Sequence, residues 1–317
     1  MNSTPLVSII LPAYNAQDYV RESIDSIIGQ TYTNWELLIA DDGSSDATRI
    51  IIDTYSDARI KKLHNKRNMG PFPTRNRLLS LAEGELITFQ DADDISHPER
   101  LERQVEALKQ DDELGIVGTW IEVVLEDKSP IHIMKYPEND ADIKKLNQTK
   151  NAFFNPTVMV RKSVYEKVGG FRQYLINGFS NQDYDWTYLV SDQCKSRNIP
   201  EILYSYRQLG NSVSKRVDPK RLIGAELVQF LGKRRRENNG EDYLYTGETE
   251  IVDQYVDKLL EPYKKDKTLV YRDYASKYMY AGLKKNAIRI SWMAVRAEPG
   301  RLINWRTLFY CLRKSTV

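Results

Sequence analysis

Acidic side chains crowd together in the first third of the chain. Asp91, Asp93 and Asp94 lie within four residues, directly after the apolar run Leu86–Phe89. Carboxylates this close repel one another, and a hard divalent cation such as Mg²⁺ or Mn²⁺ removes that cost by accepting their oxygens. Such an ion commonly takes one or two protein carboxylates and completes its shell with water and phosphate. The run predicts a metal site for a phosphate-bearing substrate, and a solvated turn is the alternative.

A second acidic cluster, Asp41–Asp46, follows the apolar run Trp35–Ala40. At the end of a strand, its carboxylates can accept hydrogen bonds from the imide N–H of a nucleobase or from a ribose hydroxyl. A turn with Asx-type hydrogen bonds and a helix cap is the alternative. The spacing does not fit an EF-hand, because Leu38 and Ala40 stand where oxygen ligands are needed.

Two further side chains have types that suit group transfer. Arg75 is expected near a helix start, where a guanidinium suits a diphosphate, and a surface arginine is the alternative. Asp183, expected at the start of a helix near Tyr184 and Trp186, is a candidate general base. An ordinary helix-start carboxylate, favoured by the macrodipole, is the alternative.

The elements that must position these groups alternate between strand and helix patterns. Expected strands span Val7–Leu11, Trp35–Ala40, Ile60–Leu63, Leu86–Phe89, Ile116–Val124 and Ile202–Tyr206. Expected helices span Asp18–Ile28, Ala47–Tyr55 and Pro73–Leu81, and one opens within Asn181–Trp186. Such alternation predicts a mainly parallel sheet flanked by helices, with ligands at the carboxyl ends of the strands.

Three local patterns add boundaries to this outline. Ser96–Glu99 has the form of a capping box with proline at the first helical position, and predicts a helix from there to about Gln110. Gly169–Phe171 indicates a tight turn. The chain has helical patterns beyond about Pro219, and the polar run at 233–240 predicts a break that could mark a domain boundary.

In this order, the segments resemble glycosyltransferase family 2, an inverting family with the GT-A fold, over Val7 to about Ser214. The matching stretches are Val7–Asn15, Asp41–Asp46, Asn68–Gly70, Arg75–Asn76, Asp91–Asp94, Phe154–Pro156, Gly169–Phe171 and Tyr206–Arg207. The Gln-x-x-Arg-Trp motif of processive synthases is absent, so the resemblance implies transfer of a single sugar. It also implies residues 1–218 as a GT-A catalytic domain, with residues 219–317 as a helical C-terminal region.

The resemblance implies a role for each donor-binding residue. Pro12, Ala13, Tyr14 and Asp41 should hold the nucleobase, with Asp41 facing the imide N–H of uracil. Arg75 should approach the diphosphate. These roles imply a nucleotide-sugar donor, with a UDP-sugar favoured.

The resemblance likewise implies the metal and catalytic groups. Asp91 should contact ribose or a metal-bound water, and Asp93 should coordinate Mn²⁺ or Mg²⁺ with support from Asp94. Asp183 should be the catalytic base. Gln182 stands where the family has Glu, which leaves the partner of Asp183 open. The implied enzyme is a metal-dependent hexosyl- or N-acetylhexosaminyltransferase.

The implied acceptor is a hydroxyl of a saccharide or glycolipid, in the synthesis of bacterial surface polysaccharide. A catalytically silent GT-A-shaped module that binds nucleotide or saccharide is the alternative. No segment has the roughly 20 apolar residues of a transmembrane helix, so a cytoplasmic location is expected. The formal net charge of +2 and the lack of a base-reading motif speak against nucleic acid.

The C-terminal segment Ala281–Val317 is basic and aromatic. It contains eight Lys or Arg residues and one acidic residue, Glu298, with Trp292, Trp305 and Phe309 interleaved. A helical subdomain that packs these aromatic residues on the catalytic domain, or on another subunit in a homo-oligomer, is the favoured interpretation. The pattern is also typical of helices that lie on an anionic membrane, so a peripheral location on the inner face of the cell membrane is the second interpretation.

Overall fold

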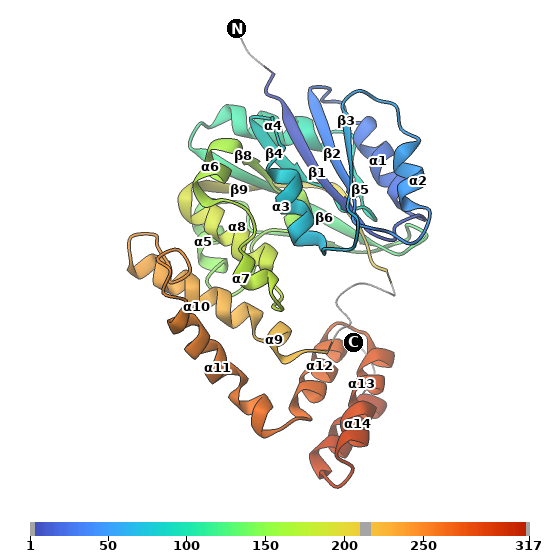
Figure 1. Ribbon diagram of the computed structural model, residues 1–317, viewed down its shortest axis with the longest axis vertical. Helices are drawn as coiled ribbons and strands as arrows, with labels where there is room; N and C mark the ends of the chain where they lie inside the picture. Colours follow the sequence, from blue (N-terminus) through green and yellow to red (C-terminus); the bar gives the residue numbers. More distant parts are fainter. Residues whose placement is uncertain (1–3, 210–216, 315–317) are drawn as a thin grey trace. The chain divides into compact units, whose positions relative to one another are not determined.

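The computed structural model describes residues 4–209 and 217–314, and its strands form one nine-stranded sheet (Figure 1). The strand order is β3-β2-β1-β4-β8-β6-β9-β5, with β7 paired to β6. The bounds are Val7–Ala13 (β1), Trp35–Asp41 (β2), Ile60–His64 (β3), Leu86–Phe89 (β4), Ile95–Ser96 (β5), Leu114–Val124 (β6), Pro130–Met134 (β7), Met159–Arg161 (β8) and Lys195–Arg207 (β9). Strands β3, β2, β1 and β4 run parallel, and β8 is antiparallel to both of its neighbours.

Helices cover both faces of the sheet, and the alternation of side chains along β1 explains why. Ile9 and Leu11 lie in the core under α1 (Val20–Ile28), α2 (Thr48–Asp53) and α4 (Arg100–Gln110). Ile10 points to the other core, under α3 (Pro71–Leu79), α5 (Asp140–Leu146), α6 (Lys162–Val168) and α8 (Gln182–Gln193). Since both faces are buried, the strand is apolar except for Ser8, whose hydroxyl donates to the carboxylate of Glu36. The predicted α/β class with a GT-A-like sheet is confirmed.

The predicted capping box is wrong. Ser96 lies in β5, and its hydroxyl donates to Oε1 of Gln90 at 2.6 Å. Helix α4 begins only at Arg100, and its N-cap residue, Glu99, forms no side-chain capping bond. Tertiary pairing of β5 with β9 therefore overrides the local signal.

The start of α3 and the turn at Gly169 pack against each other. Helix α3 begins at Pro71, two residues before the predicted start. Asn76 on this helix accepts from the backbone N–H of Phe171 and donates to its carbonyl, each at 2.8 Å. Gly169 has φ of +74°, which confirms the predicted tight turn.

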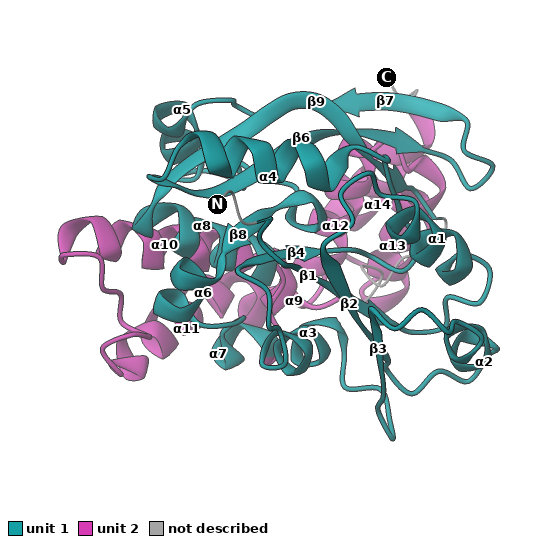
Figure 2. Ribbon diagram, turned by 90° about the horizontal axis from the view of Figure 1, so that it is seen from above, with its two compact units in different colours: residues 1–176, 182–212 teal, residues 177–181, 213–317 magenta. Residues whose placement is uncertain are grey.

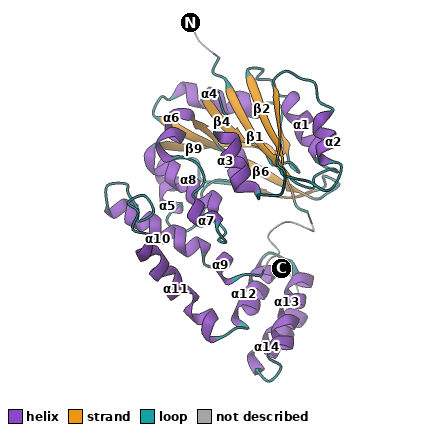
Figure 3. Ribbon diagram, viewed as in Figure 1, coloured by secondary structure: helices purple, strands orange, loops and turns teal. Residues whose placement is uncertain are grey.

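The chain forms two compact units, coloured separately in Figure 2: residues 1–176 with 182–212, and residues 177–181 with 213–317. The described part of the second unit is helical (Figure 3). Its helices are α9 (Pro219–Leu222), α10 (Gly224–Glu237), α11 (Thr249–Lys265), α12 (Leu269–Tyr280), α13 (Lys284–Ala297) and α14 (Leu302–Arg313). The predicted helical C-terminal extension is confirmed, whereas the domain boundary after residue 218 stays a prediction.

The predicted break at 233–240 is only partly right. Helix α10 continues to Glu237, because Arg235 turns inward and pairs with the buried Asp242 at 2.8 Å. A charged run thus contributes one buried ion pair to the second unit. No helix in the described part of the chain combines the length and apolar character needed to span a bilayer.

Candidate functional site

The loops after β1, β2 and β4 leave the sheet at the same edge, because these strands run parallel. Along the β1–β2 register, Pro12 pairs with Ala40 and Ala13 with Asp41. Tyr14 is the next residue along the chain. The four residues predicted to hold a nucleobase therefore gather at one edge of two neighbouring strands.

Polar side chains join the loop after β1 to the loop after β2. The backbone N–H of Asn15 donates to Oγ of Ser44 at 3.0 Å, and that of Ser45 donates to Oδ1 of Asn15 at 2.9 Å. The carboxylate of Asp41 is buried and accepts from the N–H of Ser44 at 3.2 Å. Tyr14 is 45% exposed, so its ring is available to stack on a base.

Asp42 shapes the loop that opens α3, a role that the sequence analysis missed. Its Oδ1 accepts from the N–H of Met69 at 3.0 Å and from Nδ2 of Asn65 at 2.7 Å, and its Oδ2 accepts from the N–H of Gly70 at 2.9 Å. These bonds satisfy backbone donors at the helix start. Asp42 thereby positions the helix that carries Arg75.

Arg75 lies in the second turn of α3 and is buried. Its guanidinium forms an ion pair with Asp91, which neutralises a charge that burial would otherwise make costly. Its Cζ lies 5.4 to 6.0 Å from the ring centroids of Phe72, Phe89 and Phe171. Nε of Arg75 has no hydrogen-bond partner among the described residues, which leaves a donor for a ligand.

The three carboxylates after β4 have different surroundings. Asp91 is paired with Arg75, whereas Asp93 forms no ion pair within residues 4–209 and 217–314. Burial and the charge of Asp91 raise the pKa of Asp93 to about 6, although Arg207 and Arg75 act in the opposite direction. A cation beside Asp93 would favour its ionised form.

Asp94 is buried against the end of β9. Its Oδ1 accepts from the backbone N–H of Arg207 at 2.8 Å, while burial and then the charge of Asp93 raise the pKa of Asp94 well above its usual range. Arg207 in turn pairs with Glu22 and lies 5.0 Å from the ring centroid of Tyr19. The acidic loop is therefore held by β9, which is more than 100 residues later in the chain.

The residues present fit a Mg²⁺ or Mn²⁺ ion that is completed by substrate. In the described part of the chain, no three His, Cys, Asp or Glu side chains form a ready-made metal cage. Mg²⁺ is commonly held by one or two carboxylates, with water and substrate phosphate as the other ligands. Asp93 is the carboxylate that suits this role, with Asp91 beside it.

Asp183 is the second residue of α8 and is half-buried. Burial raises the pKa of Asp183, while the N–H of Tyr184 and the charge of Arg75 lower it and the charge of Asp91 raises it. The charges of both members of the Arg75–Asp91 pair thus act on the ionisation of Asp183. Burial and then the Asp183 charge also raise the pKa of Tyr136, a neighbour that sequence reasoning missed.

The residues flanking Asp183 have structural partners. Asp185 is buried and receives a hydrogen bond from Nε of Arg172 at 2.8 Å within an ion pair. Gln182 is buried, and its Nε2 donates to the carbonyl of Leu175 at 3.3 Å. Gln182 thus ties the start of α8 to α7 (Gln173–Ile176).

Arg100, a residue that sequence reasoning also missed, anchors the end of the strand that precedes the acidic loop. It is fully buried, and its Nη1 donates to the carbonyls of Phe89 at 3.1 Å and Pro156 at 2.9 Å. It therefore joins the end of β4 to the short 3₁₀ turn Asn155–Thr157. No local signal distinguishes it from the other arginines of the chain.

Comparisons with known proteins identify the same family that the sequence motifs resemble. A family model described as glycosyl transferase family 2 matches residues 8–169. The putative glycosyltransferase EpsE of Bacillus subtilis is 34% identical over 251 residues, covering 77% of this chain and 88% of that protein. The Escherichia coli UDP-Glc:alpha-D-GlcNAc-diphosphoundecaprenol beta-1,3-glucosyltransferase WfgD is 46% identical over 115 residues, covering 36% of this chain and 46% of WfgD.

Solved structures share the fold at low sequence identity. S. aureus TarS 1-349 in complex with UDP-GlcNAc has a TM-score of 0.59 at 16% identity, covering 97% of this chain and 91% of that one. The mannosyltransferase PcManGT from Pyrobaculum calidifontis, in complex with GDP-Man and Mn²⁺, has a TM-score of 0.52 at 16% identity, covering 94% and 89%.

Proposed function

This chain belongs to glycosyl transferase family 2, and we propose that it transfers one sugar, with inversion, from a UDP-sugar to a hydroxyl of a saccharide or glycolipid. The observation that carries this proposal is the buried Arg75–Asp91 ion pair at the carboxyl ends of the parallel strands, whose charges also act on the pKa of Asp183 on α8. A base and a diphosphate-binding arginine are the two groups that a direct displacement needs.

The donor would lie along the edge formed by β1 and β2. The exposed ring of Tyr14 supplies a stacking surface, and Pro12 and Ala13 line the backbone beside it. Asp41 offers a buried carboxylate for the imide N–H of uracil. The UDP-sugar named for WfgD supports uracil, although the GDP-Man in PcManGT shows that this fold also accepts guanine.

Asp183 would accept the proton of the acceptor hydroxyl, whose oxygen attacks the anomeric carbon opposite the leaving group. One C–O bond forms as the bond to the diphosphate breaks, so the configuration inverts. Arg75 would stabilise the charge that develops on the leaving diphosphate. Burial makes Asp183 a stronger base than an ordinary aspartate by raising its pKa.

Asp93, with Asp91 and Asp94 beside it, would hold the Mn²⁺ or Mg²⁺ ion. When bound, the metal supplies positive charge to the diphosphate oxygens. The raised pKa of Asp93 supports this assignment, because burial and the charge of Asp91 outweigh the opposing charges of Arg207 and Arg75, and a bound cation would favour the ionised carboxylate.

The acceptor would belong to surface polysaccharide synthesis, since WfgD is named for a diphosphoundecaprenol-linked acceptor. A lipid-linked acceptor would bring the protein to the cytoplasmic face of the membrane. Assembly into a homo-oligomer is compatible with this function and is not required by it.

Calorimetric titration of UDP into the full chain, with and without Mn²⁺, tests the donor site. We expect metal-dependent binding that Asp93→Ala weakens at least tenfold and that Asp112→Ala, at a fully exposed carboxylate, leaves unchanged. Equal binding by both variants would remove Asp93 from the metal site. Binding without transfer to any saccharide or lipid-linked acceptor would favour the silent binding module.

A further inference from the structure

Helices α13 and α14 concentrate positive charge. Between Lys284 and Lys314 the chain has eight Lys or Arg residues and one acidic residue, Glu298, a net charge of +7 in a chain of formal net charge +2. Glu298 is itself paired with Arg301 at 2.9 Å. The rest of the chain therefore has a net negative charge, whereas these two helices have a net positive charge.

One face of α13 mixes basic and apolar side chains. The exposed residues of this face are Lys285, Arg289, Trp292, Met293 and Arg296. Their spacing of four, three, one and three residues puts them on a single stripe of the helix. The opposite stripe, with Ala287, Ile290 and Ala294, is buried within the second unit.

Helix α14 repeats the same spacing and the same chemistry. Its exposed stripe contains Leu302, Arg306, Phe309, Tyr310 and Arg313, of which Leu302 is 78% and Phe309 50% exposed. No acidic residue lies on either stripe.

Aromatic rings connect the two stripes. The ring of Trp305 lies 6.0 Å from that of Trp292 on α13 and 6.2 Å from that of Phe309 on its own helix. We call the two stripes, joined by Trp305, the α13–α14 face.

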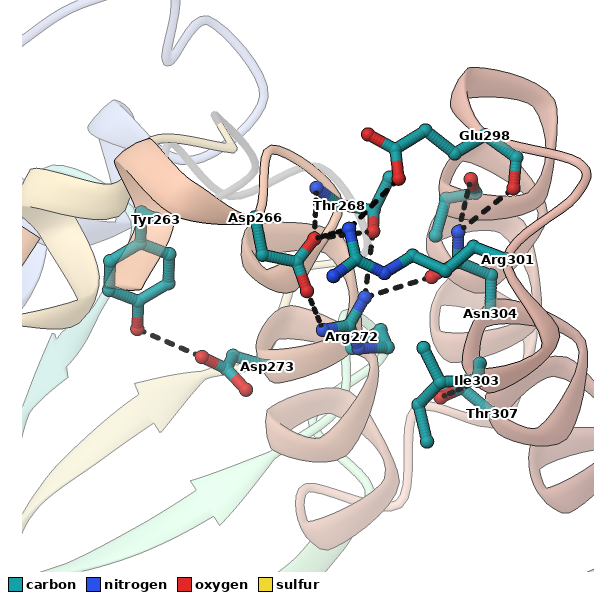
Figure 4. Close-up of polar contacts among 11 residues, drawn as sticks. Tyr263, Asp266, Thr268, Arg272, Asp273, Glu298, Arg301, Ile303, Asn304 and Thr307 are labelled. Atoms are coloured by element: carbon teal, nitrogen blue, oxygen red, sulfur yellow. Dashed lines mark hydrogen bonds and ion pairs between the residues drawn. The ribbon is translucent and has the colours of Figure 1, made fainter. Parts of the chain in front are cut away.

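A polar network fixes the two helices against α12 (Figure 4). Asp266 pairs with Arg272 and, at 2.8 Å, with Arg301. Asn304, fully buried on α14, accepts from Nη1 of Arg272 at 2.9 Å and donates to the carbonyl of Ala294 on α13 at 3.0 Å. The α13–α14 face is thus held in place by the folded unit, and docking it would order little additional chain.

We propose that the α13–α14 face docks the protein on an anionic lipid bilayer. The basic residues would meet headgroup phosphates, and Trp292, Leu302 and Phe309 would enter the interface between headgroups and acyl chains. This inference goes beyond the proposed transfer reaction, because docking needs neither donor nor acceptor.

Two other occupants fit the face less well. A second copy meeting it across a twofold axis would bring like charges together, since such an interface uses the same patch twice. A nucleic acid would neutralise the charge but gives no partner to exposed aliphatic side chains such as Leu302, Ile303 and Met293.

Co-sedimentation of the full chain with vesicles tests the proposal. We expect binding to phosphatidylcholine vesicles that contain phosphatidylglycerol, and little binding to phosphatidylcholine alone. Arg289→Gln with Arg296→Gln should weaken binding roughly 30-fold, because each basic residue near an anionic surface contributes about fivefold. The matched double variant Lys109→Gln with Lys258→Gln, at exposed residues elsewhere, should bind like the wild type.

A second pair of variants tests the apolar contribution. Leu302→Gln with Phe309→Gln should weaken binding at least fivefold, and Ile50→Gln with Tyr245→Gln, at residues 70% and 72% exposed, should not. Unchanged circular dichroism melting would show that each variant is folded. Absence of vesicle binding, or equal losses in test and control pairs, would overturn the proposal. Dimerisation in light scattering that depends on Leu302 and Phe309, without lipid binding, would assign the face to a second copy.

Discussion

Asp183 and Asp185 show how two like side chains on one helix take different tasks. Asp185 is buried and neutralised by Arg172, so it holds the helix in place. Asp183 forms no ion pair among the described residues, although the charge of Arg75 lowers its pKa and that of Asp91 raises it. The candidate base is therefore the one of these two carboxylates that has no direct ion-pair partner in the described part of the chain.

Asp183→Asn should lower kcat by about 10²–10⁴-fold while leaving UDP affinity unchanged, because Asn keeps the shape but cannot accept the proton. The measurement is sugar transfer, alongside calorimetric titration of UDP with Mn²⁺. Asp112→Asn, at an exposed carboxylate, is the control and should keep wild-type kcat. Near-normal turnover by Asp183→Asn would show that another group is the base.

The pH profile tests the same residue without a substitution. Burial raises the pKa of Asp183, and the base acts only when it is ionised, so kcat should fall as the pH decreases through this raised pKa. The acid limb should lie above the ordinary aspartate value of about 4. A kcat that stays constant down to pH 4 would contradict the assignment.

At the scale of elements, the edge of the sheet is built by loops that fasten one another. Asp42 accepts backbone bonds from the loop that opens α3, and Asn15 does the same for the loop after β2. Gly43 allows the close approach of these loops, with φ of +73° and the position of a Cβ only 2.6 Å from the backbone carbonyl carbon of Arg67. The site therefore depends on loop packing as much as on its charged residues.

Gly43→Ala should destabilise the protein by about 2–4 kcal/mol, since it adds a backbone clash to the cost of a positive φ. Gly282→Ala is the matched control, because Gly282 follows helix α12 with φ of +73° and has no atom within 4 Å of a Cβ. It should cost about 1 kcal/mol. Denaturant unfolding measures both, and equal losses would mean that the loops relax to admit the methyl group.

At the scale of the whole molecule, each unit has its own source of stability. Sheet and helices share two apolar cores in the first unit. The second unit has a smaller apolar core around Tyr274 and Ile290, and relies also on the polar network centred on Asp266. Burial alone would raise the pKa of Asp266, but hydrogen bonds from Arg272 and Thr268 lower it to about 2.

Asp266→Asn should therefore reduce the free energy of unfolding at pH 7 by about 2 kcal/mol. Because the folded-state pKa is lowered, this stabilisation is complete above the unfolded-state pKa of about 4 and disappears as the pH falls towards 2. Urea unfolding followed by circular dichroism at pH 7, 5 and 3 measures it. Asp257→Asn, which breaks an exposed pair with Lys264, should cost under about 1 kcal/mol. If the free energy of unfolding that Asp266→Asn removes did not change with pH, the ion pairs of Asp266 would not be the cause of the loss.

The sequence by itself determined the family, the strands and the order of the acidic and basic groups. Runs such as Val7–Leu11, which is apolar except for Ser8, identify buried strands because both faces of such a strand are covered. The gathering of Asp41, Asp91 and Arg75 at one edge also follows, since parallel strands end on the same side.

Only the tertiary structure decided how these groups are supported. Asp42 binds a loop 27 residues later, Asp94 is held by Arg207 113 residues later, and Ser96 joins a strand instead of capping a helix. A local pattern reports helix and strand propensity, whereas these partners become neighbours only when the sheet assembles. Burial then raises the pKa of carboxylates such as Asp93 and Asp183. Neither the type nor the spacing of the residues in the sequence reveals how deeply each one is buried.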